Sequence, residues 1–470
     1  MRQILFKSFP KGGPKNFRKP SVAFSEKLFA LLFAAVLAFS ASSCSDSGDS
    51  YEDDSSGLSS SGSTTKASSS SSGSSTYSPS CSDSNASSVT YSFINADGVT
   101  VTYHALYLID GEEKSYSASD FADGKVEASY SNEIAFLVIN GGSLTLDGIE
   151  IAKSGDATTS SISDDAYNFY GLNDAVVAVG SGTSAVLNGC TVNSSAIHGN
   201  AVFAADDAKI TVTGGITIKN TQERGGRGFF ASYGGSVVSS DGGVVISTSG
   251  NNSAALATDR GGGTIIVTGE SNVLSTQSND SPCVYSTGTI AVSGVTGTAA
   301  AAQAIVVEGK NQVSASGCVF TGARSGQGCV MLYQSMSGDA SDSDASSSYT
   351  TAELTDCVFY NQFASSGEAM FYVTNTEAEV TESGCVFYAG TGATGYSSGY
   401  VLILCEENDS NSWGTSGSNG GNITLSASGE TLSGTLTASE SDSSISVTCG
   451  TSELVKGSGS GTVTVNGTAL

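Results

Sequence analysis

The chain has 470 residues, of which 58 are glycine and only 5 are proline, and it carries 19 basic residues against 45 acidic ones, a formal net charge of -26. This balance excludes a nucleic-acid binder that depends on clustered lysine and arginine. Charged residues make up only 14% of the chain, against about 25% in ordinary globular domains. Because His104 and His198 are the only histidines, a histidine-rich metal enzyme is not expected.

Residues 1–43 have the pattern of an export signal. Seven basic residues lie among the first 27, a twelve-residue apolar run follows at 28–39, and small residues fill positions 40–43. A basic segment, a short apolar run and a small-residue cleavage site are typical of a signal peptide. The run is too short for a membrane span, which needs about 20 residues. We therefore expect an exported chain without a spanning helix.

The four residues that end at Cys44 read Ala-Ser-Ser-Cys. They resemble a bacterial lipobox, although Ala41 stands where leucine is commonest. The resemblance implies that Cys44 is acylated and anchors the protein in the bacterial outer membrane or on the cell surface. The alternative is ordinary cleavage near Ser43, which leaves Cys44 as a free thiol.

Residues 44–88 are dominated by serine, which accounts for 22 of the 44 residues after Cys44. Their few apolar residues stand alone, so the segment cannot bury enough surface to offset the entropy of ordering it. We expect a disordered, flexible tether. No role is assigned to Cys81 within it.

From residue 89 the sequence consists of short β-branched runs separated by glycine, asparagine and aspartate. A short piece recurs in which glycine or aspartate precedes two apolar residues that flank one other residue. Its second residues stand at Ile149, Cys190, Ile216, Val244, Cys318, Cys357 and Cys385. Several successive copies are 26 or 28 residues apart, and the longer intervals fit two units or one unit with an insertion.

Each unit holds three short strands in about 25 residues, which predicts one coil of a parallel β-helix. The connections are too short for crossover helices, a propeller blade needs about 40 residues, and a β-sandwich offers no reason for the period. We expect a single all-β solenoid over 89–470 with about ten or eleven coils, in which 89–133 form the N-terminal cap.

This pattern resembles the right-handed parallel β-helix superfamily, the pectate-lyase-like fold that bacterial surface adhesins share. More narrowly, it is similar to adhesin-like surface lipoproteins of unknown function. The resemblance rests on the repeat and on no catalytic motif.

Four of the ten cysteines occupy the inward-facing repeat position: Cys190, Cys318, Cys357 and Cys385. Buried thiols pack as small hydrophobic groups, so we expect core positions, with Phe320, Phe359 and Phe387 stacked beside them. The alternatives are a disulfide within the Cys318, Cys357 and Cys385 set, a metal site, for which the paired spacing of zinc ligands is missing, and a nucleophile–base pair of Cys190 with His198.

Insertions on such a scaffold are candidates for ligand binding. They lie at 152–174, 337–349 and 406–421, and the last two are expected to leave the same corner of the solenoid with a groove between them. Its candidate carbohydrate-binding residues are Trp413, Asn375, Glu377 and Tyr333. Oxygen ligands for Ca²⁺ would come from Asp339, Asp342, Asp344, Glu406 and Asp409. Solvated acidic turns are the alternative interpretation.

Three functions remain open at this stage. A noncatalytic cell-surface protein, adhesin-like or structural, fits the tether and the acidic charge, requires no cofactor and binds a polysaccharide or a cell surface. A Ca²⁺-dependent carbohydrate-binding protein fits the predicted groove. A polysaccharide lyase or hydrolase fits the fold resemblance alone, and the sequence offers no catalytic set for it.

Overall fold

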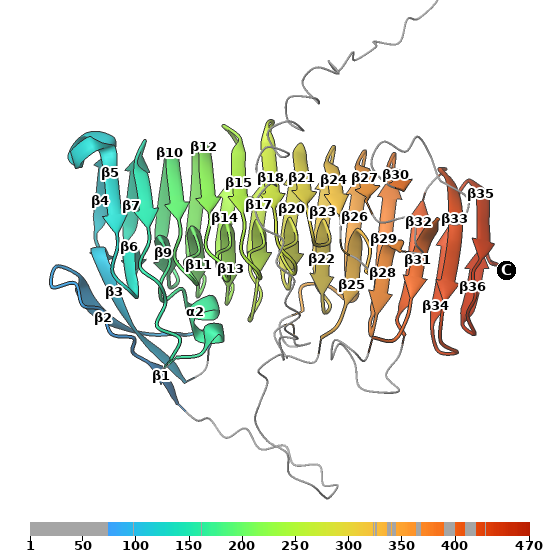
Figure 1. Ribbon diagram of the computed structural model, residues 1–470, viewed down its shortest axis with the longest axis horizontal. Coiled ribbons are helices and arrows are strands. Elements are labelled where there is room, and N and C mark those ends of the chain that lie inside the picture. Colours follow the sequence, from blue (N-terminus) through green and yellow to red (C-terminus); the bar gives the residue numbers. More distant parts are fainter. Residues whose placement is uncertain are drawn as a thin grey trace, which may run out of the picture. The chain divides into compact units, whose positions relative to one another are not determined.

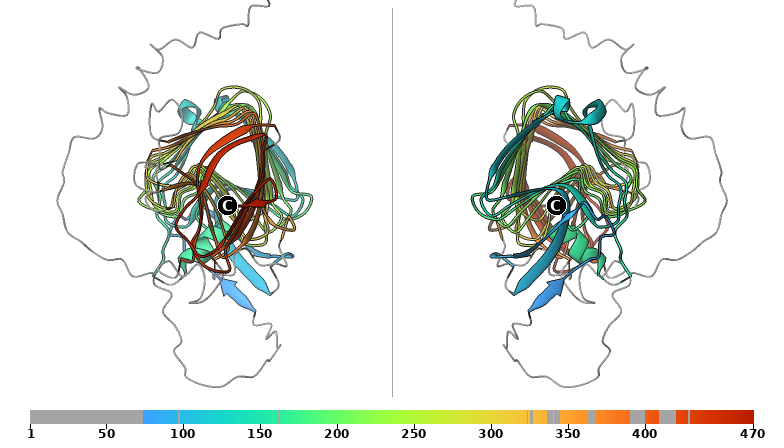
Figure 2. Two further views of the ribbon diagram at one scale, coloured as in Figure 1. Left: turned by 90° about the vertical axis from the view of Figure 1, so that its right-hand side faces the viewer. Right: turned by 90° about the vertical axis from the view of Figure 1, so that its left-hand side faces the viewer.

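The repeat units form the coils of a parallel β-helix. The computed structural model describes residues 74–470 apart from 97, 161, 323, 325–326, 336–339, 341–344, 363–367, 390–399, 409–419 and 428. Most coils contribute one strand to each of three parallel ladders, which we call ladders A, B1 and B2. Figure 1 shows the strands side by side, and in Figure 2 the strands of successive coils overlay one another around a common interior.

Ladder A is a sheet of fourteen strands in parallel order, and β2 (Ser87–Ser92) pairs with β3 in the antiparallel direction. Its strands are β1 (Ser75–Tyr77), β3 (Val99–Asp110), β6 (Glu133–Ile139), β9 (Val176–Val179), β11 (Val202–Ala205), β13 (Phe229–Ser232), β16 (Leu256–Thr258), β19 (Val284–Ser286), β22 (Ile305–Glu308), β25 (Val330–Tyr333), β28 (Ala369–Thr374), β31 (Val401–Cys405), β33 (Thr431–Ala438) and β35 (Thr451–Lys456).

Ladder B1 forms a second side of the helix and ends in an antiparallel pair of β36 with β37 (Thr468–Ala469). Its strands are β4 (Glu113–Ser117), β7 (Ser143–Asp147), β10 (Ser184–Ser194), β12 (Lys209–Asn220), β14 (Ser236–Ser239), β17 (Thr264–Val267), β20 (Thr289–Ser293), β23 (Gln312–Ser316), β26 (Thr350–Thr355), β29 (Glu377–Ser383), β32 (Asn422–Ala427), β34 (Ser444–Thr448) and β36 (Thr462–Val465).

Ladder B2 shares the long strands β10 and β12 with ladder B1, because both strands continue around the corner between the two ladders. Its other strands are β5 (Lys125–Ala128), β8 (Glu150–Lys153), β15 (Val244–Thr248), β18 (Asn272–Thr276), β21 (Val295–Ala299), β24 (Val319–Gly322), β27 (Val358–Asn361) and β30 (Val386–Ala389).

The predicted fold class is confirmed: the described part of the chain is one nearly all-β solenoid built on long parallel ladders. Ladder A has twelve strands from β6 to β35, slightly more than the ten or eleven coils expected from the period. The difference arises because some coils are short. Val284 pairs with Ile305, and Thr435 pairs with Val455, so these coils advance by fewer residues than the 26 assumed.

The glycine of the recurring piece marks the corner between ladders B1 and B2. At this corner the backbone enters the left-handed region, with φ of 59° at Gly189 and 61° at Gly317. Glycine adopts this conformation without a steric penalty, and aspartate tolerates it better than most residues. Asp356 takes the same place with φ of 51°. The sequence signal therefore reflects a bend of the backbone that recurs in the coils with strands in both ladder B1 and ladder B2.

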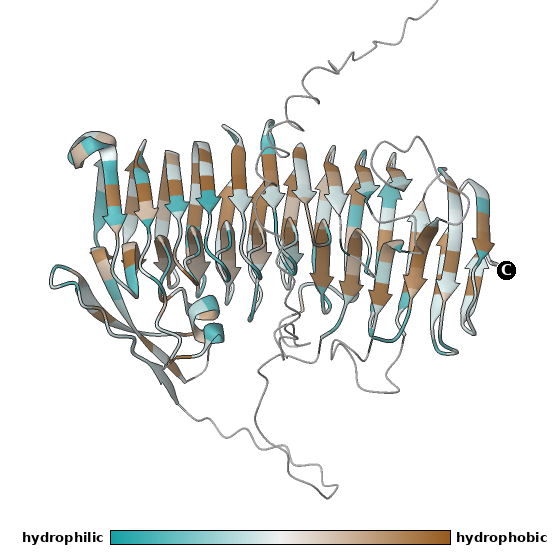
Figure 3. Cartoon of the chain, in the orientation of Figure 1, coloured by the Kyte–Doolittle hydropathy of each residue, from teal (hydrophilic) through white to brown (hydrophobic). Residues whose placement is uncertain are grey.

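Alternating side chains of each ladder fill a continuous interior. In β8, Ile151 is buried and Glu150 is exposed, and the same alternation of apolar and polar residues is visible along many strands in Figure 3. Ile151, Val192 and Ile218 occupy the same register position in three successive coils, all within one hydrophobic cluster that extends through the solenoid. Each coil thus buries the apolar face of its neighbours, which is how repeat proteins gain stability.

The cysteine and phenylalanine positions predicted to face inward do so. Cys190, Cys318 and Cys357 are buried, Cys385 is half-buried, and all four are free thiols. The rings of Phe320, Phe359 and Phe387 stack in sequence beside them, with centroids 5.7 Å apart at each step.

The N-terminal half of ladder A is covered on its outer face by a second hydrophobic cluster. Helix α2 (Asp164–Tyr170), within the predicted 152–174 insertion, is capped by Ser163 and ends at Gly171, and two 3-10 turns (Ala118–Asp120 and Ala122–Gly124) precede β5. Tyr170 packs against Phe93 with ring centroids 4.9 Å apart. Figure 1 shows α2 beside β1 to β3.

The described fold begins before residue 89. Strand β1 and the first two residues of β2 fall within the segment whose serine content predicts a tether, and β1 pairs with β3. The predicted cap 89–133 contains most of β2, together with β3, β4 and β5. Within the described part of the chain, no helix has the length and apolar character needed to cross a membrane.

Candidate functional site

The outer face of ladder A carries a buried carboxylate in the C-terminal half of the solenoid. In β22 the side chains of Ile305 and Val307 join the interior cluster, so Val306 and Glu308 point to the opposite face. Glu308 pairs in register with Tyr333 of the next coil. Glu308 is only 1% exposed, so its charge must be balanced by hydrogen-bond donors.

Hydroxyl groups of the neighbouring coils are among these donors. Tyr333 donates to Glu308 Oε2 at 2.7 Å, and Tyr285 donates to the same oxygen. Ser335 donates to the other carboxylate oxygen, Oε1. Because donors from the coils on both sides converge on one side chain, Glu308 joins β19, β22 and β25 on the outer face of the sheet.

Burial, followed by the negative charge of Glu308, raises the pKa of Tyr285 well above its ordinary value, and the pKa of Tyr333 is raised by the same causes. Both phenols therefore remain protonated at neutral pH and act as donors. This arrangement stabilises an anion of the protein itself, so it resembles a structural network more closely than an open ligand site.

A second carboxylate, Glu406, follows strand β31 on the same face. Burial raises its pKa, with Glu440 as a further cause, and Tyr372 contacts it by a side-chain hydrogen bond. Asn408 donates to the Tyr372 hydroxyl at 2.6 Å. The sheet register places Glu406 three strands beyond Glu308, a separation of about 14 Å at the usual strand spacing.

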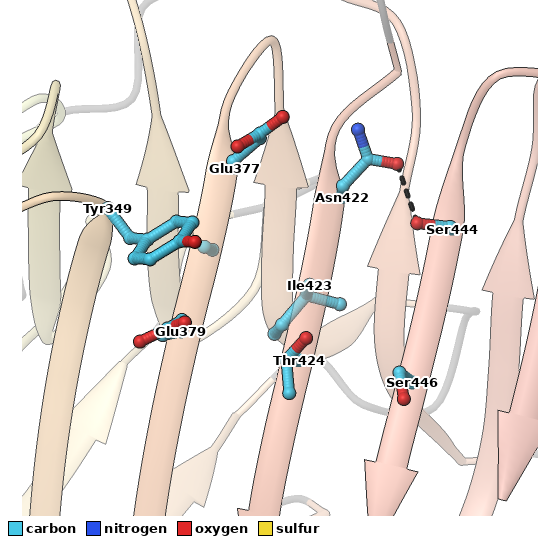
Figure 4. Close-up of a pocket in the computed structure, with 9 residues that line it drawn as sticks. Tyr349, Glu377, Glu379, Asn422, Ile423, Thr424, Ser444 and Ser446 are labelled. Carbon is cyan, nitrogen blue, oxygen red and sulfur yellow. Dashed lines mark hydrogen bonds between the residues drawn. The ribbon is translucent and has the colours of Figure 1, made fainter. Parts of the chain in front are cut away.

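A shallow groove of about 170 Å³ lies on a different side, over the outer face of ladder B1. It crosses β29, β32 and β34, as Figure 4 shows. The walls combine one aromatic ring, two carboxylates, an amide and several hydroxyls: Tyr349, Glu377, Glu379, Asn422, Thr424, Ser444 and Ser446. Ser444 donates to the side-chain oxygen of Asn422 at 2.7 Å, which fixes the amide orientation. Pockets that enclose drug-sized molecules measure about 300–1,000 Å³, so this groove suits an exposed group of a larger ligand.

The residues of the predicted groove are divided between these two faces. Tyr333 and Glu406 belong to the outer face of ladder A, whereas Glu377 lines the groove on ladder B1. Asn375 lies in the turn that joins the two sides, with φ of 54°, and its amide donates to the carbonyl of Gln334 at 2.9 Å. Asn375 therefore holds a turn in place.

The described strands show between which elements the two predicted loops lie. One loop joins β25 to β26 and the other joins β31 to β32, so both leave the same corner in coils two apart. Other predicted residues lie outside the described part of the chain: the lipidation residue Cys44, the ring of Trp413, and the proposed calcium ligands Asp339, Asp342, Asp344 and Asp409.

Two further hypotheses concern metals and nucleophiles. Among the described residues, no three His, Cys, Asp or Glu side chains are arranged to hold a metal ion. The Sγ atom of Cys190 donates to the backbone carbonyl of Leu146 at 3.6 Å, inside the solenoid. His198 instead contacts Asp164 at 3.3 Å and Asn168 at 3.1 Å on helix α2. The structure therefore gives Cys190 and His198 separate partners.

The sequence analysis did not identify Tyr285, Tyr372 or Tyr349. Tyr285 and Tyr372 alternate with core residues along ladder A strands, so their side chains point away from the interior. A strand-by-strand alignment of the coils would have identified these outward-facing positions. Tyr349 is the last residue of the 337–349 insertion, where the repeat gives no register. Searches against family models, curated proteins and solved structures found no match to this chain.

Proposed function

We propose that the chain is an exported, noncatalytic surface protein, adhesin-like or structural, that offers one side of a β-helix to an extended partner. The observation that carries this proposal is an in-register row of thirteen outward side chains along ladder B1, of which nine are serine or threonine. We call it the outer row: Glu113, Ser143, Ser184, Lys209, Ser236, Thr264, Thr289, Gln312, Thr351, Glu379, Thr424, Ser446 and Thr464.

Its side chains repeat at about 4.8 Å, the spacing of adjacent strands. Hydroxyls at regular intervals along an open sheet can donate and accept hydrogen bonds at many points of a polymer or a cell surface. Such a surface gains affinity by the number of its contacts. We further propose that the fold belongs with the right-handed, pectate-lyase-like β-helices, which the bent glycine corner and the stacked interior columns favour.

The proposed anchor is the acylated Cys44, which the serine-rich residues before β1 would connect to the folded part. Acyl chains hold a protein on a bilayer because each buried methylene contributes about 0.8 kcal/mol. Expression of the full chain in a Gram-negative bacterium, followed by membrane fractionation and fatty-acid labelling, tests this. Labelling should disappear in the Cys44→Ser variant, and an unlabelled parent protein would contradict the anchor.

The positions of the carboxylates Glu308 and Glu406 do not favour a polysaccharide hydrolase. Glycoside hydrolysis uses two carboxyl groups about 5–9.5 Å apart, and the spacing of about 14 Å between Glu308 and Glu406 exceeds this. Release of reducing ends or unsaturated uronates from a polysaccharide panel would overturn the noncatalytic proposal.

Carbohydrate binding is the second candidate, and the groove of Figure 4 favours it. An exposed ring beside amide, hydroxyl and carboxylate groups is suited to one face and the edge hydroxyls of a sugar. Tyr349 is 37% exposed there, and Glu377 and Glu379 project from β29. Calcium bound by Asp339, Asp342, Asp344, Glu406 and Asp409, and stacking on Trp413, remain part of this candidate.

A glycan array with and without Ca²⁺ tests both candidates. If sugar binding resides in the groove, Tyr349→Ala should remove it, while Trp413→Ala tests the predicted loop. Tyr130→Ala is the matched control, because Tyr130 is similarly exposed in a distant N-terminal coil. Binding that both Tyr349→Ala and Trp413→Ala retain would exclude the groove and the loop, and Ca²⁺-independent binding would exclude the calcium role.

A further inference from the structure

The corner between ladder B2 and ladder A holds a lysine in an unusual place. Lys153 ends β8, faces the interior and is only 1% exposed. The next coils have Ser194 and Asn220 at the same register position, and these short side chains donate to nearby backbone carbonyls. Lys153 makes similar contacts, with Nζ donating to the carbonyl of Gly155 and, at 3.3 Å, to that of Tyr130.

Asn173, in the next coil, shares a hydrogen-bond acceptor with this lysine. Its side chain is fully buried, and its Nδ2 donates to the carbonyl of Gly155 at 3.0 Å and to that of Ile197 at 3.1 Å. The two side-chain nitrogens thus share the carbonyl oxygen of Gly155. The other end of the amide, Oδ1, is buried and has no hydrogen-bond partner.

Glu133, the first residue of β6, supplies an acid at the same corner. It is 1% exposed, and its Oε2 accepts from the backbone nitrogen of Tyr130 at 3.2 Å. Its Oε1 is buried without a hydrogen-bond partner. Tyr130 therefore contacts Glu133 through its nitrogen and Lys153 through its carbonyl.

We propose that Lys153 and Asn173 form an intramolecular isopeptide bond after folding, with Glu133 as the proton-transfer group. Nζ of the neutral lysine attacks Cγ of Asn173, and a new C–N bond forms as the Cγ–Nδ2 bond breaks. Glu133 delivers a proton to the leaving nitrogen and takes one from the attacking amine. The products are one secondary amide and one ammonia, so no oxidant or cofactor is required.

The protonation states suit this reaction. Burial lowers the pKa of Lys153 to about 8, which makes the nucleophilic neutral amine accessible near neutral pH. Burial, with Asp83 as a further cause, raises the pKa of Glu133 to about 7, so a protonated acid is available in the same range. Burial is the largest cause of both shifts, and the exclusion of water also protects the intermediate from hydrolysis.

The bond would close the insertion that contains α2 into a covalent loop. Lys153 and Asn173 lie on either side of Asp164–Tyr170, whose Tyr170 packs on the outer face of ladder A through its ring contacts. Covalent closure restricts the unfolded chain and so opposes local opening of this cover.

Peptide mapping of the purified full chain decides the question. Trypsin cuts after lysine and arginine, and residues 126–209 contain only Lys153 as an internal cleavage site. The bond predicts one fragment, 126–209, uncut at Lys153 and lighter than its sequence mass by one ammonia. Two separate fragments, 126–153 and 154–209, both at full mass would overturn the proposal. A lighter 154–209 with normal cleavage after Lys153 would indicate succinimide formation instead and would also overturn it.

Two variants test the assignment of roles. Lys153→Met should abolish the loss of ammonia, and Glu133→Gln should leave the amide and lysine unlinked. Glu127→Gln is the matched control, because Glu127 lies on the adjacent strand β5 with an exposed side chain and should still cross-link. A Glu133→Gln protein that cross-links as completely as the parent would exclude the proton-transfer role. If either variant fails to fold, the fragments of the parent protein alone decide whether the bond exists.

Discussion

Tyr333 and Glu308 lie opposite each other on adjacent strands, and the phenol donates to the carboxylate at 2.7 Å on the outer face of ladder A. Both side chains are buried, so neither group can exchange this contact for a full shell of water. A charged acceptor that loses a donor in such a place retains its desolvation cost. The pair therefore couples two coils through a polar contact outside the hydrophobic interior.

Replacing Tyr333 with phenylalanine should lower the free energy of unfolding by about 1–3 kcal/mol, because Glu308 would keep its burial and lose a donor. Urea unfolding followed by circular dichroism measures this change. Tyr349→Phe is the control, since Tyr349 is 37% exposed and its substitution should shift stability by less than about 0.5 kcal/mol. If Tyr333→Phe and Tyr349→Phe had the same free energy of unfolding, the hydrogen bond from Tyr333 to Glu308 would contribute nothing to stability.

The stacked phenylalanines lead to a second prediction. Phe359 is fully buried between Phe320 and Phe387. Phe359→Ala should therefore destabilise the C-terminal coils by about 3–5 kcal/mol, through lost burial and the cavity left behind. Thermal unfolding and limited proteolysis would detect it, with early cleavage near β27.

Tyr360→Ala is the matched control for Phe359→Ala. Tyr360 is on the same strand but faces outward, where its ring stacks on Tyr388 at 5.1 Å. Tyr360→Ala should therefore lower the free energy of unfolding by clearly less than Phe359→Ala does. If the outward variant were as unstable as the inward one, the interior column would not be the main source of stability in these coils.

The repeat could be predicted because the coils place the same two requirements on the sequence. The corner needs a left-handed residue, hence Gly317 and Asp356, and the next position needs an apolar interior group, hence Cys318 and Ile216. These requirements recur in each coil that has strands in both ladder B1 and ladder B2. They give the strand order and the inward face directly, without any information from distant residues.

The groups on the outer faces could not be predicted in the same way. Glu308 and Tyr333 belong to different coils, and their contact depends on the exact register between strands that the sequence separates by a variable turn. Helix α2 is only seven residues long, too short for a helical period to be recognised, and its burial depends on Phe93 and other residues from the N-terminal strands. The position of Tyr349 could not be predicted either, because an insertion interrupts the repeat there.

The buried acids predict an unusual dependence of stability on pH. Burial raises the pKa of Glu382 from 4.5 to about 7 and that of Asp174 from 3.8 to about 7. Between about pH 4 and 7 the folded chain holds protons that the unfolded chain releases. The free energy of unfolding therefore falls as the pH rises through this window, and this contribution is constant above it. His198 partly offsets the trend, because burial lowers its pKa to about 4.

Urea unfolding at pH 5.0 and pH 7.5 should accordingly give the higher stability at the lower pH. Glu382→Gln keeps the shape of the side chain and removes its titration, so the difference between the two conditions should shrink. Glu379→Gln, an exposed position on the same strand, is the control and should leave the difference unchanged. A parent protein that is more stable at pH 7.5 would show that other groups dominate.

The three stacked cysteines give a prediction about thiol reactivity. Cys318 and Cys357 are buried and Cys385 is half-buried, and all are free. The hydrogen bond with Cys318 and burial raise the pKa of Cys357 to about 11, and that of Cys385 is raised by its contact with Cys357 and by burial, so these two residues form little thiolate at neutral pH. The hydrogen bond with Cys357 lowers the pKa of Cys318, but this thiol is shielded by burial. In the native protein a maleimide should label Cys385 slowly and leave the other two unmodified.

Denaturation without a reductant should then expose all three thiols of this set to the reagent, as it should expose the fully buried Cys283, which serves as the internal control. The reason is that only packing, and no covalent bond, protects them. Peptide mass spectrometry reads each site separately. If Cys283 reacts after denaturation while two of the three remain unlabelled until a reductant is added, those two form a disulfide, and the column is held by a covalent link between coils as well as by its packing.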